Sequence, residues 1–166
     1  MIARRIAYAA ALIAAVAPAA PAAAQDHAGH GGEDPSHAVL ATIERMFEGM
    51  RTADSAMTRS AMADQARFAM IGRDGNIQVA PVDGWIEAIA GSEGRWDERI
   101  YDSVVQVDMP IASAWTPYTF YLDGQVRHCG VNTIELLFVG GEWKVTQISD
   151  SRRQEDCPDP LGAGTD

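Results

Sequence analysis

The sequence lacks most of the features that mark sites for nucleotides, metals or covalent catalysis. It contains only two cysteines and four histidines in 166 residues. It has no phosphate-binding glycine loop, nucleophile elbow or internal repeat. Basic residues are scarce as well, because 13 lysines and arginines stand against 23 acids and give a formal net charge of -10. Nucleic acids and anionic membranes require a basic surface, so neither is an expected partner.

Long hydrophobic runs are absent after residue 24, and the segment before it has the pattern of a secretory signal peptide. Arg4 and Arg5 form a basic start, an apolar run follows, and three alanines precede Gln25. The apolar run is well short of the roughly 20 residues that cross a bilayer. We therefore predict cleavage of residues 1–24 and a periplasmic or secreted mature protein.

The two cysteines, Cys129 and Cys157, are expected to form one disulfide in such an oxidising compartment. The bridge would tie a C-terminal segment to a preceding strand. The alternative is two separate thiols. A catalytic pair of Cys129 with His128 is disfavoured, because adjacent residues of a strand face opposite sides of the sheet.

Residues 25–34 form a polar, glycine-rich leader, which we predict to be flexible. The leader and the residues just after it contain His27, His30 and His37, a composition that suggests capture of Cu(II) or Ni(II). The alternative is a solvated linker. On this second interpretation the protein has no metal site, and we predict no cofactor.

Hydrophobic periodicity predicts three helices in the N-terminal half of the remaining chain. Asp34, followed by proline, starts a first helix that carries one apolar stripe. Asp54 is the predicted cap of a second helix, which runs to about Met62. Asp83 is the predicted cap of a third helix, which Gly91 ends.

Strand-forming segments lie on both sides of the third helix. Before it, two short strands are joined by an Asp-Gly turn. After it, proline and glycine turns separate four long strands, which should form a consecutive antiparallel meander. These strands are predicted over residues 96–109, 111–122, 125–139 and 142–149. The expected architecture is an α+β roll, with three helices packed on one face of a curved antiparallel sheet.

The closing segment ASAWTPYTFYLDGQVRHCGVNTIELLFVGGEWKVTQISDSRR, together with this order of elements, resembles the nuclear transport factor 2-like superfamily. That superfamily includes ketosteroid isomerase, scytalone dehydratase and the SnoaL-like polyketide cyclases, and the Gly-x-Trp-Lys-Val hairpin is typical of SnoaL-like members. The resemblance covers residues 35–153, inside a domain placed at 35–157 and followed by a disordered tail at 158–166. It implies a cone-shaped fold around an apolar cavity.

The resemblance does not extend to isomerase activity. The first helix has no tyrosine, and the first strand offers Arg67 where the isomerases carry an acid.

Two polar residues share a face with the most apolar positions of the third long strand, namely His128 and Asn132. A buried polar group needs a partner, and a ligand at the mouth of the cavity could supply one. The same reasoning predicts Tyr118, Gln147 and Trp143 as ligand-binding residues. The alternative is that each is a core residue satisfied by its neighbours.

Trp115 and Tyr121 fall on the opposite face of the sheet. A homodimer through the sheet, which is common in the resembling proteins, explains them better than a ligand does. Arg152 and Arg153, which follow Asp150, could anchor an acidic ligand, but structural ion pairing is the favoured interpretation.

Three hypotheses about function follow. The leading one is a secreted domain that binds a small hydrophobic or amphipathic organic molecule in its cavity, without assigned chemistry. The alternative is a SnoaL-like lyase, isomerase or cyclase in which His128 is the general base, oriented by Asp97 or Asp108. The third is a dimerisation module whose cavity is vestigial.

Overall fold

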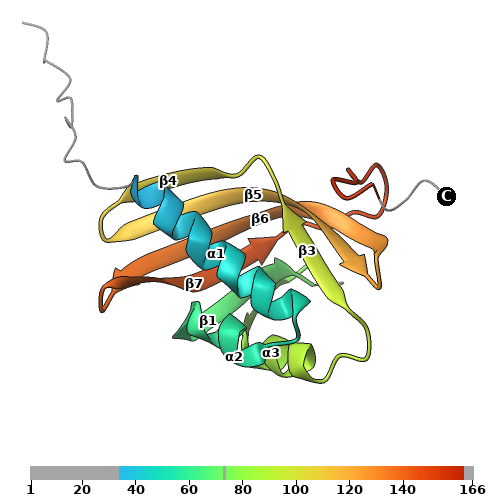
Figure 1. Cartoon of the computed structure of the whole chain (residues 1–166), viewed down its shortest axis with the longest axis horizontal. Helices are drawn as coiled ribbons and strands as arrows, with labels where there is room; N and C mark the ends of the chain where they lie inside the picture. The colour runs from blue at the N-terminus through green and yellow to red at the C-terminus, as the bar shows by residue number, and fades with distance from the viewer. Residues whose placement is uncertain (1–33, 73, 163–166) are drawn as a thin grey trace, which may run out of the picture. The chain divides into compact units, whose positions relative to one another are not determined.

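The structure is a computed structural model that describes residues 34–72 and 74–162. It confirms the predicted α+β arrangement, in which three helices lie on one face of a curved seven-stranded sheet (Figure 1). The predicted signal peptide and the leader histidines His27 and His30 lie outside the described residues, whereas His37 is exposed on the first helix. Within the described part, no helix is long and apolar enough to span a membrane.

The first two helices begin where the sequence predicts. Helix α1 (Pro35–Arg51) starts at Asp34, whose carboxylate accepts a hydrogen bond from the Ser36 N–H, and Asp54 caps α2 (Ser55–Ser60) in the same way. The buried stripe of α1 consists of Val39, Ile43, Met46, Phe47 and Met50. These side chains pack on the inner face of the sheet and form the centre of the hydrophobic core.

The predicted cap of helix α3 (Asp83–Ala90) is wrong by one residue. The residue at the cap position is Val82, and no side chain caps this helix. Asp83 lies in the first turn, where its carboxylate pairs with Arg59 of α2. An acidic residue in the first turn stabilises the helix by interacting with the helix dipole. In the sequence, such a residue cannot be distinguished from an aspartate at the cap position.

The sheet contains the expected meander and an additional parallel pairing. The strands are β1 (Met62–Ile71), β2 (Ile77–Pro81), β3 (Trp96–Ile100), β4 (Val104–Asp108), β5 (Ile111–Leu122), β6 (Gln125–Val139) and β7 (Glu142–Asp150). Their order is β2-β1-β7-β6-β5-β3, and β4 also pairs with β5. Because β1 runs parallel to β7, the hairpin of β1 and β2 extends the meander instead of lying apart from it.

The long strand predicted over 96–109 is broken into β3 and β4, which pair with different halves of β5. The break lies opposite Pro117, which has no N–H to continue the ladder. Asp102 in the connection has a φ of 46°, in the left-handed region. The inward-facing positions change parity across this break, from Trp96 and Ile100 in β3 to Val105 and Val107 in β4.

A bulge in β7 decides which of its side chains reach the core. Glu135 pairs with Gln147 but Leu136 pairs with Val145, so Thr146 is an extra residue. The shift places Ile148 on the inner face together with Val145. Gln147, predicted to lie on the same face as Val145, is therefore turned to the outer face.

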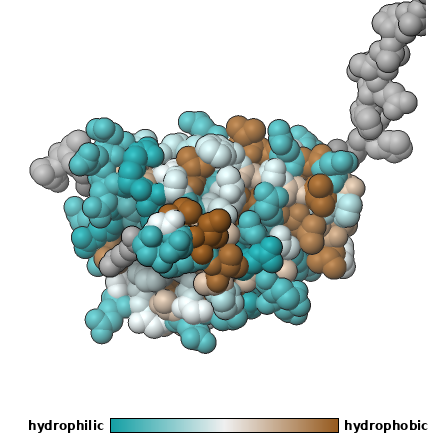
Figure 2. Space-filling model, turned by 180° about the vertical axis from the view of Figure 1, so that it is seen from behind, coloured by the Kyte–Doolittle hydropathy of each residue, from teal (hydrophilic) through white to brown (hydrophobic). Residues whose placement is uncertain are grey.

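The outer face of the sheet carries several exposed apolar side chains. Trp115 is 54% exposed, and its neighbours in this group are Val104, Ile111 and Leu137. Figure 2, which views the side away from α1, shows hydrophobic residues gathered in separate areas of the surface. Tyr121 was predicted to lie with Trp115 on this face, but it is not part of the exposed group. It is fully buried, and its hydroxyl donates to Asp159 at 2.7 Å.

A disulfide joins Cys129 of β6 to Cys157, as predicted. Beyond it, the Thr119 hydroxyl of β5 donates to the carbonyl of Pro158 at 2.7 Å. Ordered contacts with the sheet therefore continue past residue 157, into the segment predicted as a tail.

Replacing both cysteines, Cys129→Ser with Cys157→Ser, should lower the free energy of unfolding by about 3–4 kcal/mol, because the bridge closes a loop between residues 28 positions apart. Urea denaturation of the variant and of the wild type, with and without reductant, measures the change. Equal unfolding midpoints for the oxidised wild type and the variant would contradict this role of the bridge.

Candidate functional site

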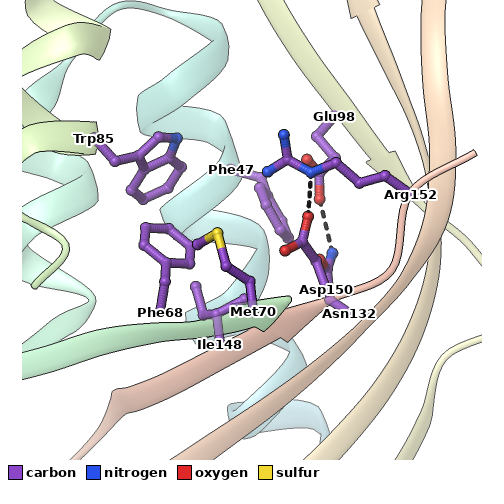
Figure 3. Close-up of a pocket in the computed structure, with 9 residues that line it drawn as sticks. All are labelled: Phe47, Phe68, Met70, Trp85, Glu98, Asn132, Ile148, Asp150 and Arg152. Atoms are coloured by element: carbon purple, nitrogen blue, oxygen red, sulfur yellow. Dashed lines mark hydrogen bonds and ion pairs between the residues drawn. The ribbon is translucent and has the colours of Figure 1, made fainter. Parts of the chain in front are cut away.

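A cavity of about 230 Å³ opens between the helices and the inner face of the sheet. Its apolar wall consists of Phe47 from α1, Phe68 and Met70 from β1, Trp85 from α3 and Ile148 from β7. The rings of Phe68 and Trp85 meet edge to face, with centroids 5.5 Å apart. Figure 3 shows these aromatic side chains on one side of the cavity and a polar group on the other.

The polar end of the cavity is formed by Glu98 of β3, Asn132 of β6, Asp150 of β7 and Arg152 just after it. The Asn132 side-chain amide donates to the Glu98 carboxylate at 2.7 Å, and the Arg152 guanidinium donates to Asp150 (Figure 3). Arg152 thus forms an ion pair, as expected from the sequence, and it also faces the cavity. Carboxylate, amide and guanidinium groups together offer both acceptors and donors to a bound molecule.

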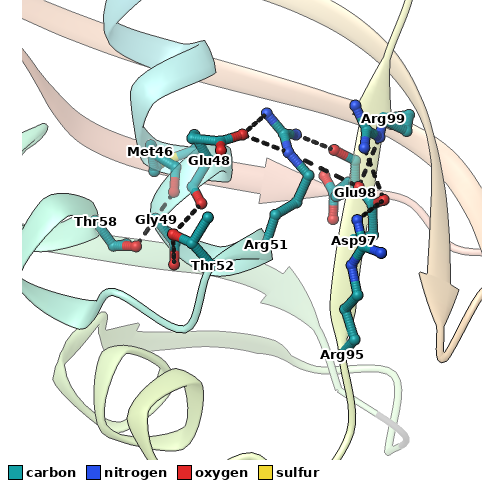
Figure 4. A network of polar contacts seen from close by, with 10 residues as sticks. All are labelled: Met46, Glu48, Gly49, Arg51, Thr52, Thr58, Arg95, Asp97, Glu98 and Arg99. Atoms are coloured by element: carbon teal, nitrogen blue, oxygen red, sulfur yellow. Dashed lines mark hydrogen bonds and ion pairs between the residues drawn. The ribbon is translucent and has the colours of Figure 1, made fainter.

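A network of charges at the end of α1 fixes the position of β3 (Figure 4). Arg51 donates to the backbone carbonyl of Glu98 at 3.2 Å and pairs with Glu48 at 2.7 Å. On the other face of β3, the buried carboxylate of Asp97 pairs with Arg99 at 2.7 Å. Because β3 is held to α1 and flanked by ion pairs, the side chain of Glu98 is directed into the cavity.

Burial raises the pKa of Glu98 from its ordinary value of 4.5 to about 7. The hydrogen bond from Asn132 lowers this pKa, and the nearby charge of Asp150 raises it. Near neutral pH, both the neutral and the ionised form of Glu98 are therefore populated.

Glu98 was not predicted as a site residue. The segment Asp97-Glu98-Arg99 contains three consecutive charges, which usually indicates a solvated strand edge. A signal was nevertheless present, because Trp96, Glu98 and Ile100 alternate with the other charges and place the glutamate on the apolar face.

His128 lies on the inner face of β6, as predicted, but it does not line this cavity. Its ring stacks on Phe120 with centroids 4.8 Å apart and meets Tyr118 edge to face at 5.8 Å. It lines a separate open groove together with Arg152 and Arg153. Burial and the charge of Arg152 lower its pKa.

Three more of the predicted site residues lie outside the cavity lining. Tyr118 is buried and donates its hydroxyl to the Ser151 carbonyl at 3.1 Å. Trp143 packs in the hydrophobic core. Gln147 accepts a hydrogen bond from Arg67 at 3.0 Å on the outer face. Of the five candidates, only Asn132 faces the cavity.

The proposed orienting carboxylates of His128 have other positions. Asp97 is engaged with arginines on the face of β3 opposite Glu98. Asp108 pairs in register with Ile111, far along β5 from Phe120, whose cross-strand partner is His128. Among the described residues, no cluster of three or more histidine, cysteine or acidic side chains has the geometry to hold a metal ion.

A family model with the description "Putative lumazine-binding" matches residues 34–147. The chain belongs to this family. The fold is that of the nuclear transport factor 2-like superfamily, as the sequence predicted, and the matches among solved structures agree. A search of curated proteins found no match.

Three solved structures illustrate the relationship between this lumazine-binding-like domain and other proteins. A protein of unknown function from Shewanella baltica is 21% identical, with a TM-score of 0.59, and the match covers 72% of this chain and 94% of that one. A conserved protein from Planctomyces limnophilus is 17% identical, with a TM-score of 0.63 and coverages of 72% and 96%. A protein from Cytophaga hutchinsonii is 11% identical, with a TM-score of 0.62 and coverages of 72% and 99%. At such identities these matches establish the fold alone.

Replacing Glu98 by glutamine should change how the stability of this domain depends on pH. The raised pKa means that the folded state holds a proton which the unfolded state releases above about pH 4.5. Wild-type stability should therefore fall relative to Glu98→Gln as the pH rises to about 7, by about 1.4 kcal/mol for each pH unit. Urea denaturation of both proteins between pH 4.5 and 7.5 measures this difference, and parallel curves would contradict the raised pKa.

Proposed function

We propose that this protein binds a compact, flat organic molecule that carries adjacent carbonyl and N–H groups. The observation that supports this proposal is the division of the cavity into an aromatic wall and a polar end. The rings of Phe47, Phe68 and Trp85 offer flat apolar surface, while Glu98 and Arg152 offer an acceptor and a donor. Sites of this kind bind a ligand by apolar burial and orient it with a few polar groups.

The size of the cavity limits the ligand. Its volume of about 230 Å³ lies below the roughly 300–1,000 Å³ of sites that hold drug-sized molecules. One or two fused rings would fill it, whereas a steroid-sized molecule would not enter without movement of the walls. The cavity is also not filled by side chains, which argues against the dimerisation module with a vestigial cavity.

The hydrogen-bonding groups fit the edge of a cyclic amide or imide. An ionised Glu98 accepts a hydrogen bond from a ligand N–H, and the guanidinium of Arg152 donates to an adjacent carbonyl. Lumazine, the ligand named in the family description, is a flat bicyclic molecule with such an imide edge. We therefore propose lumazine and related bicyclic heteroaromatic molecules as ligands of the right class.

A second candidate function is proton transfer to or from the bound molecule. The arrangement in its favour is a carboxyl group with a pKa of about 7, held by Asn132 in a largely apolar cavity. A pKa near the working pH suits a general acid or base. In this variant of the enzyme hypothesis, Glu98 takes the role of general base that was predicted for His128.

Two further parts of the proposal concern the setting of the domain. The exposed apolar group around Trp115 supports a homodimer through the outer face of the sheet, which light scattering of the purified protein would test. The disulfide is compatible with the periplasmic or secreted location predicted from the N-terminal sequence.

Lumazine binding should strengthen by up to roughly tenfold between pH 5.5 and 7, because an ionised Glu98 accepts the N–H of the ligand more strongly than the protonated carboxyl does. This is a range in which lumazine itself stays neutral. Titration calorimetry of the wild type measures the affinity at each pH. The variant Glu98→Gln keeps a carbonyl acceptor but cannot ionise, so its affinity should be independent of pH.

Two outcomes would contradict the proposal. The first is the absence of lumazine binding at every pH together with retained folding. The second is binding by wild type and Glu98→Gln with the same dependence on pH, which would place the ligand away from Glu98.

A further inference from the structure

Arg152 is the only group of the polar end that lies outside the regular strands and helices. It belongs to the segment Ser151–Cys157, which we call the strap. Residues 151–156 are Ser, Arg, Arg, Gln, Glu and Asp, and all are exposed. The strap thus has no apolar side chain to bury before Cys157, and hydrophobic packing cannot hold it in place.

Backbone hydrogen bonds attach the start of the strap to β6. The Ser151 N–H donates to the Val131 carbonyl at 3.0 Å, and Arg153 and Cys129 exchange two hydrogen bonds of 2.9 Å each. These pairs continue the register of β7 on β6. Arg152 therefore lies opposite Gly130, on the same side of the sheet as Asp150 and Asn132.

Gly130 allows the strap to approach closely. A Cβ atom added at this position would lie 1.9 Å from the Ser151 carbonyl oxygen, so any side chain would push the strap away. The Tyr118 hydroxyl donates to the same carbonyl at 3.1 Å. The missing side chain of Gly130 on β6 and the hydroxyl of Tyr118 on β5 thus set the position of Ser151, the residue before Arg152.

The disulfide anchors the other end of the strap. It links Cys157 to Cys129, the residue that exchanges hydrogen bonds with Arg153 and precedes Gly130. The chain after the bridge is held to β5 through the Pro158 carbonyl. The strap is consequently fixed at both ends. Between them, the side chain of Arg152 reaches the cavity although 61% of it is exposed.

We infer that the strap, closed by the Cys129–Cys157 disulfide and seated on Gly130, is a positioning element that holds Arg152 at the ligand cavity. Without the bridge, an exposed polar segment fixed at one end has many conformations available, and Arg152 would spend less time beside Glu98. The ligand affinity of the cavity then depends on a disulfide whose sulfur atoms do not line it. This inference rests on the proposed function, because it assumes that Arg152 donates to the ligand.

A double-mutant cycle with lumazine as the probe tests the inference. The four proteins are the oxidised wild type, Arg152→Ala, the pair Cys129→Ser with Cys157→Ser, and the combination of all three substitutions. Removing Arg152 should weaken binding roughly ten- to a hundredfold, the usual effect of losing a charged hydrogen bond. Opening the bridge should weaken it by a similar factor, and the combined protein should bind no more weakly than Arg152→Ala alone.

The variant Gly130→Ala tests the seating of the strap with the bridge intact, and Gly84→Ala is its control. A Cβ at Gly84 would meet no atom within 4 Å, so this variant should bind lumazine like the wild type. Gly130→Ala should bind lumazine more weakly than the wild type. Replacing Arg152 by alanine should also weaken lumazine binding less in the Gly130→Ala background than in the wild type. A purely structural role of Gly130 would lower stability without changing the effect of replacing Arg152.

Hydrogen exchange supplies a readout that needs no ligand. The amides of Ser151 and Arg153 should exchange faster when the bridge is absent, and by a larger factor than the amides of β1, which change only with the global stability that the bridge provides. Acceleration at both positions that is no larger than in β1 would overturn the inference, and so would losses of lumazine affinity that multiply in the protein with all three substitutions. Failure of the oxidised wild type to bind lumazine, with faster exchange in the variant, would instead count against the proposed ligand and leave the positioning of Arg152 supported.

Discussion

The candidate site depends on one carboxyl group kept in a largely apolar cavity. Glu98 loses much of its hydration there, and the free-energy cost is reduced by the hydrogen bond from Asn132 and by protonation, which its raised pKa makes accessible. A cavity that contains only hydrophobic side chains would bind many apolar molecules with little preference. In the proposed function, Glu98 gives the bound molecule a direction for hydrogen bonding and makes its affinity depend on pH.

Much of the fold serves to place this one group. The arginine and acid network at the end of α1 holds β3, the bulge at Thr146 turns Ile148 and Asp150 inward, and the parallel pairing of β1 with β7 brings Phe68 and Met70 to the same cavity. The apolar face of α1 closes the opposite side. Elements far apart in sequence thus each contribute one or two groups to a single site, which is typical of a cavity between a sheet and its helices.

The sequence predicted the fold better than the site, for reasons that particular residues make clear. Amphipathic spacing and turn chemistry are local, so α1, the two capping aspartates and the meander of β5, β6 and β7 could be predicted. Register shifts are not local. The alternation that placed Asn132 correctly on β6 failed for Gln147, because one extra residue at Thr146 reverses the faces of β7. For Arg152, ion pairing was favoured over anchoring an acidic ligand, and its position at the cavity depends on how the chain continues after β7.

The contrast between His128 and Glu98 has the same origin. A histidine on an apolar strand attracts attention because its ordinary pKa is near neutrality, yet here it stacks on Phe120 outside the cavity. Glu98, between two charged neighbours, does not stand out as a candidate in the sequence, although burial raises its pKa to about 7. The most direct test is a titration of the Glu98 side-chain carboxyl by carbon-13 NMR in the oxidised protein. We predict a midpoint near pH 7, and a midpoint near the ordinary value of 4.5 would contradict the raised pKa of Glu98.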